Sequence, residues 1–216
     1  EYEEVRGRNP VAAVRPPLDI SSPRGHGSNR GEMSDLGRRL PVSPAVICLA
    51  VAVLSSGIFL LNLTAPIYFV LDEWDLVLLR QGWDPEDFLA PFHEHIVLAP
   101  SFIYHLLLGI FGQSSARPFQ VTATAAFLLC AVLLFVWMRR RTGDWAALIG
   151  TVMILFLGAA FEDLVWSFQI GYFGSIAGGL GALVALDRDD RKGDIIASVL
   201  LLVSVTFSSL ALPFIA

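Results

Sequence analysis

Residues 118–141 read "PFQVTATAAFLLCAVLLFVWMRRR", an uncharged run that three consecutive arginines end. A helix needs roughly 20 apolar residues to cross a bilayer. Helices are the expected solution because backbone polar groups in hydrocarbon must be satisfied within their own segment. Lys and Arg are enriched in cytoplasmic loops. This run therefore predicts a transmembrane helix whose arginine end, Arg139–Arg141, lies in the cytoplasm.

The composition of the whole chain agrees with a membrane protein. Its 216 residues are 55% hydrophobic and only 16% charged, whereas soluble domains are about 25% charged. The net charge of −5 gives no indication of a nucleic-acid partner. Five further uncharged runs are candidate spans, at residues 45–63, 96–112, 145–161, 164–186 and 195–216.

Three cationic clusters predict the topology: Arg38–Arg39, Arg139–Arg141, and the segment 187–194 with Arg188, Arg191 and Lys192. If all six runs crossed, the second and third clusters would lie outside. If 96–112 does not cross, all three lie in the cytoplasm, as the positive-inside rule expects. That run is short and contains Pro100. We therefore expect it to form an interfacial helix, at about 97–112, on the outer membrane surface.

The predicted fold is an all-α polytopic transmembrane helix bundle, with amphipathic juxtamembrane helices in the first outer loop, 64–117. The tail 1–43, rich in Pro, Gly, Ser and Arg, is expected to be disordered and cytoplasmic, and residues 44–216 to form the transmembrane domain. Met33 is an alternative start, and the chain is expected to be the N-terminal fragment of a longer integral membrane protein. The predicted crossings are about 45–63, 118–138, 145–161, 167–186 and 195–214.

Glycines in the run 164–186 share one helical face in "GYFGSIAGGLG". Small residues on one face allow neighbouring helices to approach closely in a membrane. We therefore expect Gly174, Gly178 and Gly181 to serve helix packing.

The outer loop holds seven carboxylates within "LDEWDLVLLRQGWDPEDFLAPFHEH", residues 71–95. Helix capping explains Asp84, which precedes a proline suited to the first helical position. Asp72 could likewise cap a short helix that ends at Gly82. Capping explains the pair Asp72 and Glu73 less well, because it directly follows the apolar "PIYFVL". Carboxylates at a membrane surface are costly unless they are solvated, paired or used.

The motif "HEH" is a second polar cluster in this loop, formed by His93, Glu94 and His95. The two histidines are two residues apart, so they lack the spacing of four that places metal ligands on one helical face. A metal site is the less favoured interpretation. Acid–base or phosphate contact is favoured, because histidine titrates near neutral pH.

The order of these parts resembles the GT-C membrane glycosyltransferases, particularly the protein O-mannosyltransferases and the lipid A aminoarabinose transferases. The resemblance covers about residues 38–216. Its parts, in order, are the acidic pair Asp72–Glu73, "HEHIVLAP", "SFIYHLLLGIFG", Arg117, "RRRTGDWAALIG" and the second acidic pair Glu162–Asp163. The sequence departs from the family in having "HEH" and a later proline in place of His-Pro-Pro, and in a shorter gap between Gly112 and Arg117.

The resemblance implies transfer of a sugar from a polyprenyl-phosphate donor to an extracytoplasmic acceptor. Asp72, with Glu73 beside it, would be the general base or would bind a divalent cation, Mg²⁺ or Mn²⁺, as cofactor. The remaining implied site residues contact substrate or its phosphate. They are Arg80, His93, Glu94, His95, Arg117, Glu162 and Asp163, of which Arg117 has an alternative role as an interfacial anchor.

Other functions remain open from the sequence. The chain could be a non-catalytic polytopic membrane protein, a transporter component whose acidic loop binds cations or a partner, or a truncated inactive product. Charged residues are absent from the middle of the predicted crossings, whereas transport pathways are commonly marked by them. This absence favours chemistry at the outer surface. The expected partners are the lipid-linked donor and membrane lipid, and the sequence specifies no oligomeric state.

Overall fold

The computed structural model describes residues 43–80, 82–90, 92 and 96–215. Helices make up most of this part of the chain, and no strand occurs within it, which confirms the predicted all-α class. The predicted tail lies outside the described residues except for Ser43. The α-helices are α1 (Pro44–Leu63), α2 (Pro85–Leu89), α3 (Leu98–Phe111), α4 (Arg117–Thr142), α5 (Asp144–Leu155), α6 (Phe161–Val165), α7 (Ile170–Leu186) and α8 (Arg191–Phe207).

Three helical segments are long and apolar enough to cross a membrane: α1, α4, and residues 167–186, where a 3₁₀ turn leads into α7. Pro44 and Pro118 each occupy the first turn of their helix, where a missing backbone N–H costs nothing. These segments support a membrane protein. The five crossings remain a prediction.

The other apolar segments are interrupted. Residues 145–161 contain α5, a 3₁₀ turn at Gly158–Ala160 and the start of α6. In residues 195–214, α8 ends at Phe207 and a 3₁₀ helix, Ser209–Phe214, packs against α7. Helix α3 has 14 residues, a length of about 21 Å, which is shorter than a hydrocarbon core.

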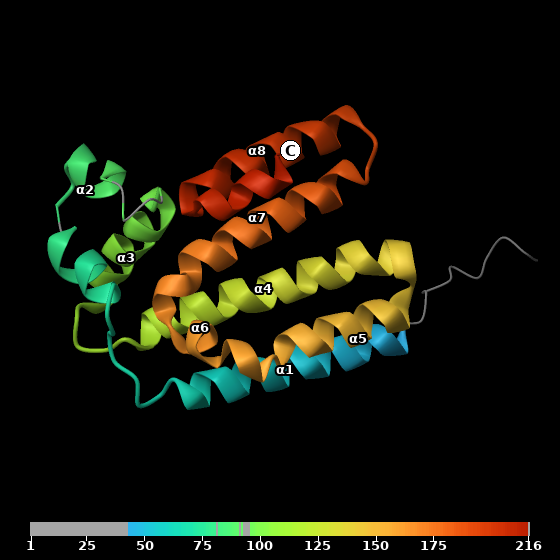
Figure 1. The fold of residues 1–216 in the computed structure, drawn as a ribbon, viewed down its shortest axis with the longest axis horizontal. Helices are drawn as coiled ribbons and strands as arrows, with labels where there is room; N and C mark the ends of the chain where they lie inside the picture. Colours follow the sequence, from blue (N-terminus) through green and yellow to red (C-terminus); the bar gives the residue numbers. More distant parts are fainter. Residues whose placement is uncertain (1–42, 81, 91, 93–95, 216) are drawn as a thin grey trace, which may run out of the picture. The chain divides into compact units, whose positions relative to one another are not determined.

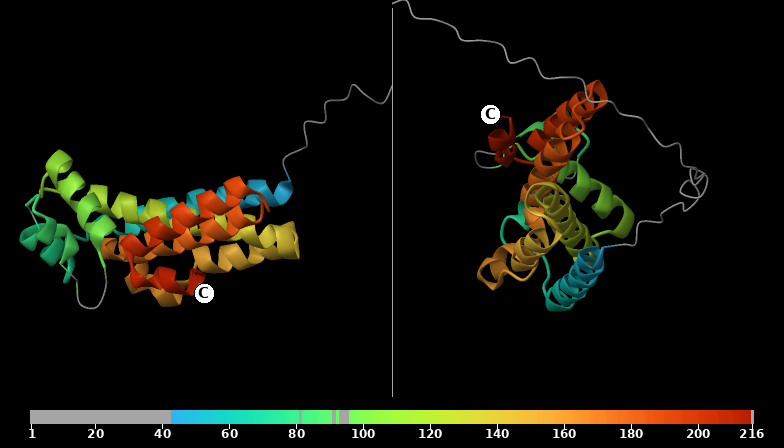
Figure 2. Two further views of the ribbon diagram at one scale, coloured as in Figure 1. Left: turned by 90° about the horizontal axis from the view of Figure 1, so that it is seen from above. Right: turned by 90° about the vertical axis from the view of Figure 1, so that its right-hand side faces the viewer.

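Helix α4 lies among the other long helices (Figures 1 and 2). It contacts α1, α5 and α7, and α7 in turn packs along α8. Helices α2 and α3 gather near the start of α4 (Figure 1). We call this the loop end, where α1 ends and α4 begins. The opposite arginine end holds Arg139–Arg141 and Asp187.

The α7–α8 contact depends on small residues, as the sequence predicts. A Cβ atom on Gly178 would lie 2.7 Å from the Cβ of Ser204 and 3.2 Å from its Cα. A Cβ on Gly174 would overlap the ring of Phe207. The Ser175 hydroxyl donates to the Ser208 carbonyl at 3.1 Å, which adds an interhelical hydrogen bond.

The loop between α1 and α3 contains two short helical pieces. Asp84 takes the N-cap position of α2 and Pro85 its first helical position, as expected, although the Asp84 side chain makes no capping hydrogen bond. A π-helical turn, Asp75–Leu79, stands where a helix after Asp72 is predicted. Glu73 and Trp74, just before this turn, are also helical, so the helical segment begins directly after Asp72.

Candidate functional site

Among the described carboxylates of the acidic loop, Glu73 is the most buried, with only 1% of its surface exposed. Its Oε2 accepts a hydrogen bond from the Val70 amide at 2.8 Å. Its Oε1 accepts from the Tyr104 hydroxyl at 3.3 Å and from the Phe168 amide at 3.1 Å. This side chain therefore connects the loop to α3 and to the segment that opens α7.

The environment of Glu73 acts on its protonation in two directions. Burial raises the pKa of the carboxyl above its usual value, because a low-dielectric surrounding disfavours the charged form. Hydrogen bonds from Val70, Ser167, Tyr104 and Phe168 oppose this shift, and burial is the larger effect. With so little exposure and these bonds in place, Glu73 positions the loop and does not face a substrate in this conformation.

Asp72 has a different surrounding, although it is the adjacent residue. Its side chain is partly exposed and lines a cavity of about 200 Å³. Leu71, just before it, has a left-handed backbone with φ of 45°, which is unusual for a bulky residue. The other residues that line this cavity come from the loop, α3, α7 and the end of α8. They are Phe92, Val97, Pro100, Phe168, Gly171, Tyr172, Phe207 and Ser208.

Arg80 links the loop to α3 through a hydrogen bond. Its Nη1 donates to the Asp87 carbonyl and to the Ser101 hydroxyl, both at 3.3 Å. Burial lowers its pKa, against the opposing charges of Asp75 and Asp87. It lines a separate pocket of about 500 Å³ together with Asp75, Asp84, Glu86 and Asp87. Such a pocket is acidic on balance and disfavours a phosphate.

Arg117 joins the end of α1 to the start of α4. Its Nη1 donates to the Leu61 carbonyl, to the Thr64 hydroxyl at 3.5 Å and to the Gln120 side-chain oxygen at 3.4 Å. Gln120 in turn donates to the Ile67 carbonyl at 2.7 Å. This geometry favours the anchoring role of Arg117 over phosphate binding.

The second acidic pair lies on α6, apart from the cavity lining. Glu162 and Asp163 are both exposed, and Asp163 accepts a hydrogen bond from the Gln169 side chain at 2.8 Å. The predicted residues His93, Glu94 and His95 lie outside the described residues. Within the described part of the chain, no three His, Cys, Asp or Glu side chains form a group that could hold a metal ion.

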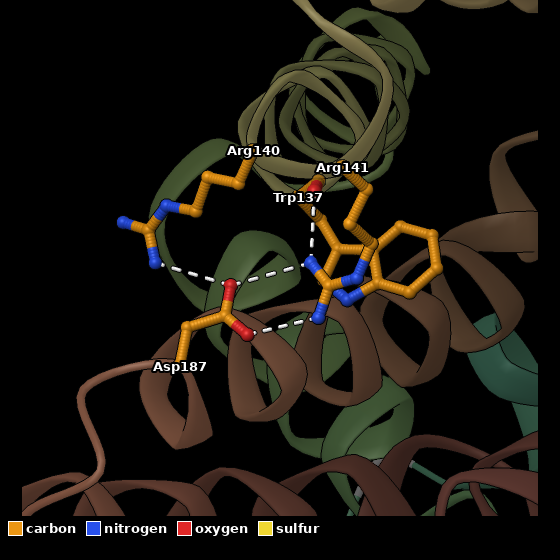
Figure 3. A network of polar contacts seen from close by, with 4 residues as sticks. All are labelled: Trp137, Arg140, Arg141 and Asp187. Carbon is orange, nitrogen blue, oxygen red and sulfur yellow. Dashed lines mark hydrogen bonds and ion pairs between the residues drawn. The ribbon is translucent and has the colours of Figure 1, made fainter. Parts of the chain in front are cut away.

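At the arginine end, a network of side chains joins α4 to the end of α7 (Figure 3). Arg140 donates to Asp187 Oδ2 at 3.1 Å, and Arg141 donates to both carboxylate oxygens, at 2.9 and 3.3 Å. The Arg141 guanidinium also lies 4.2 Å from the centre of the Trp137 ring. Hydrogen bonds from Arg141, and then from Arg140, hold the pKa of Asp187 below its usual value.

The sequence did not single out Tyr104, Gln120 and Phe168, which hold the loop by hydrogen bonds from other segments. Tyr104 and Gln120 stand in apolar helices, where a buried polar side chain requires a partner. That requirement is the signal that could have singled them out. Phe168 contributes only its backbone amide to Glu73, and its residue type gives no such signal.

The comparisons with known proteins do not place this chain in a family. No family model, curated protein or solved structure matched this chain.

Proposed function

We propose that this protein is a membrane glycosyltransferase of the GT-C kind. It would transfer a sugar from a polyprenyl-phosphate donor to an extracytoplasmic acceptor, with Asp72 as general base. The supporting observation is the Asp72 carboxylate on the wall of a largely apolar cavity at the loop end of the long helices. Phe92, Phe168 and Tyr172 supply aromatic walls, and sugar rings stack on such surfaces through their C–H faces.

The chemistry requires one proton acceptor near the sugar. As the acceptor hydroxyl attacks the anomeric carbon, its proton passes to Asp72. The bond between the anomeric carbon and the phosphate oxygen breaks, and the lipid phosphate leaves with the bonding electrons. Attack opposite to the leaving phosphate inverts the anomeric centre. If a divalent cation takes part, Asp72 is its candidate ligand, whereas Glu73 is occupied by backbone and Tyr104 hydrogen bonds.

Glu73 has a positioning role in this proposal. Its hydrogen bonds to Val70, Tyr104 and Phe168 fix the backbone of the turn that carries Asp72. A base must be held within hydrogen-bond reach of the proton that it takes, and small displacements cost rate.

A non-catalytic role has support from a different pocket. Four carboxylates and Arg80 line the space of about 500 Å³ beside α2. If the acidic loop binds a cation or a basic partner, these four carboxylates and not Asp72 would carry the binding.

The decisive test is sugar transfer from a polyprenyl-phosphate-linked donor by membranes that contain the protein. We expect Asp72→Asn to lower turnover by about 10²–10⁴, the usual contribution of a general base. Asp75→Asn is the matched control, because this exposed acid does not line the cavity of Asp72, and it should retain activity. Equal activity of the Asp72→Asn variant and the wild type would remove Asp72 from the mechanism.

A further inference from the structure

An apolar groove of about 770 Å³ runs between α4, α7 and α8, and its lining shares Phe207 with the cavity of Asp72. Its lining extends along α4 from Thr122 to Arg140, a rise of about 27 Å, close to the thickness of a hydrocarbon core. Small and aliphatic side chains form most of its wall, among them Ala126, Leu133, Gly181, Val184, Ile196 and Leu200.

The groove has a cationic end. Arg140 and Arg188 belong to its lining, and both are about half exposed. Arg140 shares the Asp187 carboxylate with Arg141, which contacts both of its oxygens. Arg140, Arg141 and Asp187 therefore form a cluster of two positive charges and one negative charge (Figure 3), which is positive on balance, while Arg188 is paired with Asp190 at 3.1 Å.

We propose that this groove binds an anionic phospholipid, with the lipid phosphate against Arg140 and Arg188 and one acyl chain along α4, α7 and α8. Guanidinium groups match phosphate oxygens in charge and geometry. Basic pockets between transmembrane helices on the cytoplasmic side bind anionic headgroups. The arginines would hold the charged headgroup, and the adjoining apolar wall would hold the hydrocarbon chain. The proposal does not depend on the glycosyltransferase function.

The headgroup test uses native mass spectrometry of the purified protein in detergent, titrated with phosphatidylglycerol or with phosphatidylcholine. We expect preferential retention of phosphatidylglycerol. Arg140→Ala combined with Arg188→Ala should weaken phosphatidylglycerol retention roughly tenfold and leave phosphatidylcholine retention unchanged. Arg191→Ala combined with Lys192→Ala removes the same charge from residues that do not line the groove. This control variant should behave as the wild type.

The acyl-chain test uses two neighbouring residues of α8. Ile195 and Ile196 are 55% and 45% exposed, but only Ile196 lines the groove. Trp at position 196 fills groove space, so Ile196→Trp should lower phosphatidylglycerol retention, whereas Ile195→Trp should not. Because both side chains are exposed, neither substitution disturbs a buried contact.

Three results would overturn the proposal. One is equal retention of the two lipids by the wild type. Another is an equal loss in the two charge variants, which would indicate a diffuse charge effect. The third is a spectrum in which the groove variants change a dimer population instead of bound lipid, which would assign the groove to a second copy of the chain.

Discussion

At the scale of single residues, Glu73 holds together segments that are far apart in the sequence. Its hydrogen-bond partners Val70, Tyr104 and Phe168 lie 3, 31 and 95 residues away. A buried carboxylate in such a position is structural as long as its acceptor oxygens are occupied. Asp72 differs because no hydrogen bond or ion pair engages its carboxylate among the described residues.

Removal of the Glu73 side chain should destabilise the protein. Glu73→Ala leaves the Phe168 and Val70 amides without their acceptor, and we expect a loss of about 2–4 kcal/mol in the free energy of unfolding. Glu73→Gln retains one acceptor oxygen, so its free energy of unfolding should fall by less than that of Glu73→Ala. Chemical unfolding in detergent micelles, followed by circular dichroism, measures both. Asp75→Ala, at an exposed carboxylate, should change stability by no more than about 0.5 kcal/mol. Equal effects of Glu73→Ala and Asp75→Ala would contradict this account.

Glu73 also predicts a pH dependence of stability. Burial raises its pKa in the folded protein above the usual value of 4.5, so the folded state holds this proton more tightly than the unfolded chain. The free energy of unfolding should therefore be highest below that usual value and should fall as pH rises through the folded-state pKa. Unfolding measurements from about pH 4 to pH 8 should show this decline in the wild type. A decline of the same size in Glu73→Gln would assign it to other groups.

At the scale of helices, α7 and α8 approach each other closely because glycine, which has no side chain, stands at their contact. Gly178 faces the backbone of α8, where Ser204 Cα and the Leu200 carbonyl would lie within 3.2 Å of a Cβ atom added at position 178. Backbone atoms yield less easily than the end of a flexible side chain. This contact therefore restricts position 178 to glycine.

A matched pair of substitutions tests that restriction. Gly178→Ala should destabilise the protein by about 1–3 kcal/mol through overpacking. Gly109 lies inside α3 with nothing within 4 Å of its would-be Cβ. Gly109→Ala should therefore stabilise by about 0.5–1 kcal/mol through helix propensity. Thermal unfolding in detergent measures both, and the same sign of change at the two positions would contradict the packing account.

Hydropathy predicted the long helices well and the interruptions poorly. Helix α1, helix α4 and residues 167–186 each contain an apolar stretch long enough to cross a membrane, which is the property that hydropathy measures. The breaks after Leu155 and Phe207 occur within uncharged sequence, "FLGAAF" and "SSLALPF", so a hydropathy average does not register them. Gly158 and Pro213 are the local signals there.

The candidate site was predictable in part for a similar reason. Asp72 and Glu73 could be singled out as a pair because they directly follow an apolar run. Their separate roles depend on Tyr104 and Phe168, which only the tertiary fold brings to Glu73. No local pattern in the sequence contains such long-range contacts.

At the scale of the whole molecule, the two ends of the long helices differ in charge: one is rich in acidic residues and the other in arginine. The acidic loop lies at the loop end, whereas Arg139–Arg141 pair with Asp144 and Asp187 at the arginine end. Under the positive-inside rule, we expect the arginine end to face the cytoplasm.

Cysteine labelling in intact cells tests this orientation. Ser114→Cys, on the exposed turn before α4, should react with a membrane-impermeant maleimide. Thr142→Cys, at the exposed end of α4, should react only after permeabilisation. Both substitutions require a background without Cys48, because this free cysteine is exposed. Labelling of Thr142→Cys in intact cells would reverse the orientation and would remove the acidic loop from the outer surface.

The left-handed turn at Leu71 has a mechanical consequence for the molecule. This backbone conformation costs a residue with a side chain about 1–2 kcal/mol, and the neighbouring bonds of Glu73 to α3 and to the segment before α7 oppose its relaxation. A shift of either segment would release the turn and displace Asp72, one peptide unit away. A movement of α3 would thus reach the cavity through the hydrogen bond between Tyr104 and Glu73.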